Sequence, residues 1–242
     1  MKIIYSITRY HVFFLLFFVL LTYGCGKDEP VSEIIVSNEI IEEEQTEELV
    51  DQLPDLGNSD AEAYYKLGID TIKMGNFELA LKAWNKAVEI DPTMVKAHSY
   101  LGRAYYTRGM MDEAIDAYKK VLELTPEDSN GYINLGIAYR YNEMYDESLD
   151  ALQKAIEINP ISAVANDEIG SSLLKKEKFD EAIGAYKNAI ALDPKFPQPH
   201  NNLGVVYLLK GMSKEAAAEF ELFEKLTVKK NAEQAKIMGG GH

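Results

Sequence analysis

Residues 95–128 have the sequence VKAHSYLGRAYYTRGMMDEAIDAYKKVLELTPED, and residues 129–162 repeat its pattern as SNGYINLGIAYRYNEMYDESLDALQKAIEINPIS. The same pattern continues in both directions, with a glycine and a proline that recur every 34 residues. The glycines are Gly68, Gly102, Gly136, Gly170 and Gly204, and the prolines are Pro92, Pro126, Pro160 and Pro194. A fixed period of this length predicts a stacked array of identical units, because neighbouring units bury each other's apolar faces.

Two more positions share the period. One is small, and the other is large and apolar or aromatic. The small position holds Ala80, Ala114, Ser148, Ala182 and Ala216, and the large one holds Trp84, Tyr118, Leu152, Tyr186 and Phe220. We interpret each unit as two helices joined by a turn, with small residues where the helices approach closely. The proline ends the second helix, because the residue before a proline is disfavoured in the α conformation.

These positions together resemble the tetratricopeptide repeat. The resemblance implies an all-α solenoid of five repeats and covers about 70% of the 242 residues. The repeats are 61–94, 95–128, 129–162, 163–196 and 197–230. Paired acids such as Asp112-Glu113 recur at the start of each expected second helix, where they favour the helix dipole. We assign them a structural role.

The resemblance also implies a concave groove that binds extended peptides. At 100° per residue, repeat positions 2, 6, 9 and 13 share the groove side of the first helix. The candidate peptide-binding residues are Lys66, Lys73, Lys96, Tyr100, Arg103, Asn130, Asn134, Tyr141, Lys175, Gln198 and Asn202. The stripe is basic in its first two repeats, which favours an acidic segment or a chain terminus. The alternative is that these charges are only solvated helix surface.

Asparagine is shared by two repeats at one groove position, as Asn134 and Asn202. An amide there can pair with both the N–H and the C=O of an extended backbone. The pattern resembles the asparagine ladder of sugar-transferase repeat arrays. The other repeats depart from it.

The first 24 residues are typical of a signal peptide. Lys2 and Arg9 precede ten apolar residues, VFFLLFFVLL at 12–21, which are too few to span a bilayer. The run ends in Thr-Tyr-Gly-Cys at 22–25, which resembles the lipobox of bacterial lipoproteins. The resemblance implies cleavage before Cys25 and acylation of this sole cysteine, and hence a lipid anchor in the bacterial cell envelope. We expect the outer membrane, with the array in the periplasm or at the surface.

Residues 25–60 are interpreted as a disordered acidic linker. The net charge is −14 overall. Residues 26–60 hold twelve acids and one base, or −11, so the charge lies mainly there. A strongly acidic chain is not expected to bind nucleic acid, because that requires a basic surface. The linker precedes the basic end of the predicted groove, and it could compete with partners for that groove.

No catalytic motif is recognisable, so the chain is not expected to be an enzyme. It has no P-loop, dinucleotide-binding glycine pattern, HExxH or GxSxG, and its single cysteine excludes a disulfide framework. We predict no metal site and no cofactor. Residues 231–242 are expected to form a short cap and a flexible tail. Because this cap is thin, a homodimer through the last repeat is possible.

These features predict a membrane-anchored scaffold that binds extended peptide segments of envelope proteins. Two alternatives remain open. One is a substrate-recruiting subunit of an envelope enzyme complex, and the other is a soluble or secreted adaptor without a lipid anchor.

Overall fold

The computed structural model describes residues 53–54 and 60–239, with side chains as far as residue 230. These residues belong to one compact unit, Leu53–His242. The predicted signal peptide, the acylation site at Cys25 and most of the predicted acidic linker lie outside the described residues.

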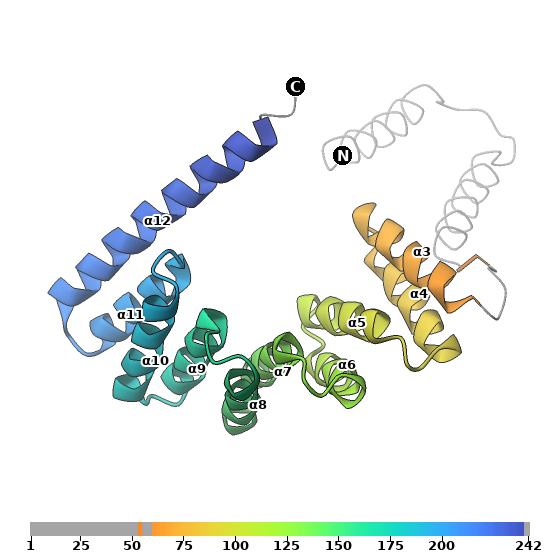
Figure 1. The fold of residues 1–242 in the computed structure, drawn as a ribbon, viewed down its shortest axis with the longest axis horizontal. Coiled ribbons are helices and arrows are strands. Elements are labelled where there is room, and N and C mark those ends of the chain that lie inside the picture. The colour runs from red at the N-terminus through yellow and green to blue at the C-terminus, as the bar shows by residue number, and fades with distance from the viewer. Residues whose placement is uncertain (1–52, 55–59, 240–242) are drawn as a thin grey trace, which may run out of the picture. The chain divides into compact units, whose positions relative to one another are not determined.

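The described residues form ten α-helices that follow one another as five pairs (Figure 1). The first helices of the pairs are α3 (Ala61–Lys73), α5 (Val95–Thr107), α7 (Ser129–Tyr141), α9 (Ala163–Lys175) and α11 (Pro197–Leu209). The second helices are α4 (Phe77–Ile90), α6 (Met111–Leu124), α8 (Tyr145–Ile158), α10 (Phe179–Leu192) and α12 (Ser213–Gly239). This arrangement confirms the predicted all-α solenoid of helix pairs.

The glycine of each first helix lies against the large residue of its second helix. A Cβ atom built on Gly102 would stand 2.6 Å from Cε1 of Tyr118, and one on Gly136 would stand 2.6 Å from Cγ of Leu152. Both distances are far below van der Waals contact. The period-34 glycines are therefore required by the close approach of the two helices in each pair.

A left-handed residue occupies the turn between the helices of every pair. Gly75, Gly109 and Gly211 have φ of +84°, +78° and +76° at this position, whereas Glu143 and Glu177 have φ of 61° and 58°. Glycine adopts this conformation without steric cost, but a residue with a Cβ atom is strained there. The third and fourth repeats thus use a less favourable residue at a conserved turn geometry.

Each repeat also contacts the acid at the start of the preceding repeat's second helix. Arg108 pairs with Glu78, Lys176 with Asp146 and Lys210 with Asp180. Asn142 donates to Asp112 at 2.9 Å in the third repeat. The acids that sequence analysis assigned to the helix dipole therefore also connect neighbouring repeats. Because these contacts are largely exposed, each is expected to contribute only about 0–1 kcal/mol.

The C-terminal end differs from the expected cap. Helix α12 runs unbroken from Ser213 to Gly239, nearly twice the length of the other second helices. The prediction of a separate short cap followed by a flexible tail is therefore wrong as far as residue 239. No proline stands where the earlier repeats have one, so nothing ends the helix there. The homodimer through this end stays a prediction.

Candidate functional site

First helices line one face of the array, which we call the A face. Successive first helices contact one another directly from α7 to α9 and from α9 to α11. A cavity of about 480 Å³ opens on this face between α5, α6, α7 and α9. It is lined by Ser99, Tyr100, Arg103, Tyr106, Tyr118, Asn134, Ile137, Arg140, Tyr141 and Glu168.

Four of the eleven predicted groove residues line this cavity. They come from the second and third repeats and are Tyr100, Arg103, Asn134 and Tyr141. Three predicted lysines lie outside it and are paired with acids. Lys96 and Lys66 approach Glu62 at 2.5 and 3.9 Å, and Lys73 approaches Asp70 at 3.1 Å. The basic end expected in the first two repeats is therefore largely neutralised by its own acids.

The other predicted residues also lie outside the cavity lining. Asn130, Lys175 and Gln198 have exposed side chains. Asn202 donates to Oδ1 of Asp167 at 2.9 Å, so it is engaged within the array. The structure does not bring Asn134 and Asn202 into one ladder, because Asn202 binds a neighbouring side chain and Asn134 faces the cavity.

Tyrosine rings and guanidinium groups form the walls of the cavity. Cζ of Arg103 lies 4.7 Å from the ring centroid of Tyr100, and Cζ of Arg140 lies 4.6 Å from that of Tyr141. The rings of Tyr106 and Tyr141 meet edge to face at 5.2 Å. Stacking of this kind holds a guanidinium group in a fixed plane.

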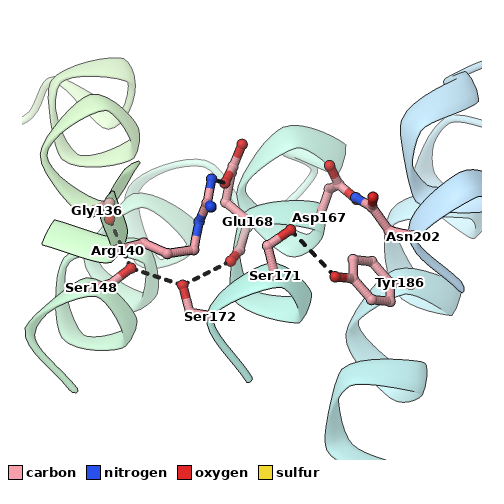
Figure 2. Close-up of polar contacts among 9 residues, drawn as sticks. All are labelled: Gly136, Arg140, Ser148, Asp167, Glu168, Ser171, Ser172, Tyr186 and Asn202. Carbon is pink, nitrogen blue, oxygen red and sulfur yellow. Dashed lines mark hydrogen bonds and ion pairs between the residues drawn. The ribbon is translucent and has the colours of Figure 1, made fainter. Parts of the chain in front are cut away.

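Arg140 forms the most enclosed ion pair on the A face. Its Nη2 lies 2.8 Å from Oε2 of Glu168, and the two side chains are 13% and 17% exposed (Figure 2). Its Nε is buried and has no hydrogen-bond partner among the described residues. The cavity thus presents a fixed guanidinium group with one donor that the protein does not use.

Sequence analysis missed Arg140, although a signal for it existed. Arg140 stands at repeat position 12, beside the predicted stripe at positions 2, 6, 9 and 13. At 100° per residue, positions 5 and 12 lie within about one residue's rotation of position 9. A wider stripe would have included Arg140, Ser99 and Tyr106, which all line the cavity.

A buried polar cluster supports α9 from below (Figure 2). The hydroxyl of Ser148 donates to the carbonyl oxygen of Gly136 at 2.7 Å and lies 2.9 Å from the hydroxyl of Ser172. The Ser172 hydroxyl in turn lies 3.0 Å from the carbonyl oxygen of Glu168. These contacts satisfy the serine that replaces alanine in the third repeat, and they fix the part of α9 that carries Glu168.

Burial changes the ionisation of several groups around the cavity. It raises the pKa of Tyr118 to about 12 and raises that of Tyr106 further above its usual value. Both phenols therefore stay protonated near neutral pH and can donate hydrogen bonds. Burial also raises the pKa of Asp167 to about 7, although the hydrogen bond from Asn202 lowers it.

The array's family is established by sequence comparison. Models of the tetratricopeptide repeat match residues 65–129, 129–161 and 170–211. Together they span more than half of the chain, which therefore belongs to the tetratricopeptide repeat family. A search of curated protein sequences gave no match.

Similar solved structures are also repeat proteins of this class. A crystal structure of MamA is 30% identical, with a TM-score of 0.61 over 69% of this chain and 97% of that chain. MamA 41-end from Desulfovibrio magneticus RS-1 is 23% identical, with a TM-score of 0.63 over 70% and 96%. YrrB, a TPR protein with an unusual peptide-binding site, is 26% identical, with a TM-score of 0.55 over 69% and 86%.

The described residues were also searched for two other kinds of feature. They contain no group of three or more His, Cys, Asp or Glu side chains that could hold a metal ion. No helix among them is long and apolar enough to cross a membrane.

The ionisation of Asp167 predicts a specific pH dependence of stability. Its folded pKa of about 7 lies above the unfolded value of about 3.9, so the unfolded carboxyl group ionises first as the pH rises. The associated stability is present below about pH 4 and is lost as the pH rises through about 7. Asp167→Asn should remove this loss, gaining about 1.4 kcal/mol over wild type for each pH unit in that window.

Urea unfolding followed by circular dichroism at pH 5 and pH 8 measures this difference. Asp150→Asn removes an exposed carboxylate and serves as the matched control. A difference between Asp167→Asn and wild type that is the same at both pH values would contradict the assignment.

Proposed function

We propose that the protein is an adaptor that binds extended peptide segments of partner proteins on its A face. The observation that carries this proposal is the cavity between α5, α6, α7 and α9, where polar and aromatic side chains from three repeats converge. Tyrosine, arginine and asparagine supply large contact area and hydrogen-bonding groups with few rotatable bonds. The likeness to YrrB, a TPR protein with an unusual peptide-binding site, supports the same conclusion.

The form of the surface favours a peptide over a folded domain. Asn134 and Tyr141 are exposed at the cavity and come from one helix, so an extended segment that crosses α5, α7 and α9 would meet both. Asn134 would pair with the backbone of such a segment, and the tyrosine rings would contact its side chains.

We further propose that the array is held at a membrane of the bacterial cell envelope through acylated Cys25. The sequence supports this with a basic start, a ten-residue apolar run and a sole cysteine directly after it. Each buried acyl CH₂ contributes about 0.8 kcal/mol, so two or more chains would anchor the protein stably. The acidic residues 26–60 would then separate the repeats from the lipid surface.

Photo-crosslinking tests the peptide-binding surface. A photoreactive amino acid at position 134 should capture a partner, and mass spectrometry should map the captured site to an extended segment of that partner. The same amino acid at position 120, on the second helix α6 of the neighbouring repeat, is the control. Equal capture from both positions, or capture of a folded domain surface, would count against the proposal.

Metabolic labelling with a fatty acid tests the anchor. The wild-type chain should incorporate the label and sediment with membranes, because acylation adds a large apolar group. Cys25→Ser should abolish both, since no other thiol is present. An unlabelled wild-type chain, or a labelled Cys25→Ser chain, would refute acylation at this residue.

A further inference from the structure

We infer that the cavity recognises a carboxylate group of the partner segment, bound at Arg103 and Arg140. The inference rests on the proposed function and specifies the chemistry of the segment that the A face binds. It also places the recognition of negative charge in the second to fourth repeats, away from the lysines of the first repeat.

The charges around the cavity leave one cation available. The lining holds two guanidinium groups and one carboxylate, that of Glu168. Arg140 pairs with Glu168 at 2.8 Å, whereas Arg103 has no ion pair among the described residues and makes its close contact with the ring of Tyr100. The cavity therefore carries an excess of one positive charge, and Arg103 is free to pair with a ligand.

Arg140 adds a donor that is already fixed in place. Its Nη2 is used by Glu168, and its guanidinium group lies over the ring of Tyr141. The buried Nε has no acceptor among the described residues. A carboxylate oxygen of a ligand would accept a hydrogen bond from Nε, while Glu168 keeps the guanidinium group oriented.

Tyrosine hydroxyl groups complete the donor set. Tyr106 and Tyr118 line the cavity, and burial raises the pKa of both phenols. They remain O–H donors at neutral pH, so they favour an acceptor that lacks hydrogens of its own. An ionised carboxylate has two acceptor oxygens and no donor, which matches this arrangement.

The same charges disfavour a phosphate group. A phosphorylated residue carries about −1.5 to −2 at neutral pH, and Glu168 would repel the charge that the single excess cation does not balance. The cavity volume of about 480 Å³ lies within the ~300–1,000 Å³ range of small-ligand sites. It therefore has room for a side chain or a chain terminus with its neighbouring residue.

Two sources could supply the carboxylate, an Asp or Glu side chain and the C-terminus of a partner. Affinity selection with the full chain in detergent micelles distinguishes them. The probes are two synthetic libraries of random octapeptides, one with free C-termini and one with amidated C-termini, and selected peptides are sequenced by mass spectrometry. A side-chain source enriches Asp or Glu at one position in both libraries, whereas a terminal source gives binders only from the free-acid library.

Substitution of Arg103 then tests the residue assignment. Arg103→Gln should weaken binding of the selected peptides about tenfold or more, because it removes a charge-assisted contact. Lys120→Gln makes the same charge change on α6, outside the cavity, and should leave the affinity unchanged. Because Arg103 is exposed, its substitution should not change the helix content or the melting temperature, which circular dichroism measures.

The outcomes separate this inference from the proposed function. Peptides that bind without an acidic residue and with an amidated C-terminus would overturn the carboxylate assignment and leave peptide binding intact. Equal losses in Arg103→Gln and Lys120→Gln, or tighter binding when phosphoserine replaces the selected acid, would overturn it as well. Recovery of no peptide from either library would count against peptide binding itself.

Discussion

The structure depends on the close contact between a glycine in each first helix and a large residue in the paired second helix. Gly68 faces Trp84 in the first repeat, and Gly102 faces Tyr118 in the second. The contact recurs every 34 residues and sets how near the two helices come. Trp84 and its equivalents Leu152 and Tyr186 are fully buried, so each pair gains apolar burial that its small partner makes possible.

This contact connects the fold to the cavity. Tyr118 packs on Gly102 and also lines the A-face cavity, so the packing of the second repeat determines part of the binding surface. The guanidinium groups of Arg103 and Arg140 project from first helices that neighbouring repeats hold in place. A rigid scaffold of this kind keeps donors oriented before a ligand arrives, which lowers the entropy cost of binding.

The helix pairs, their period and part of the site could be predicted, because they depend on residue type and spacing along one helix. Tyr100, Arg103, Asn134 and Tyr141 were found by helical periodicity alone. The pairing of charges could not be predicted in this way, because the partners belong to different repeats. Lys96 meets Glu62 from 34 residues earlier, and Arg140 meets Glu168 from 28 residues later. The unbroken α12 was missed because the absence of a proline gives no positive signal for where a helix continues.

The most direct test of the glycine contact compares Gly102→Ala with Gly184→Ala by thermal and urea unfolding. An added Cβ at 102 would stand 2.6 Å from Tyr118, whereas one at 184 meets nothing within 4 Å. Gly102→Ala should therefore lose about 1–3 kcal/mol from overpacking, and Gly184→Ala should gain about 0.5–1 kcal/mol from helix propensity. Equal stability of the two variants, or a more stable Gly102→Ala, would contradict the role assigned to this contact.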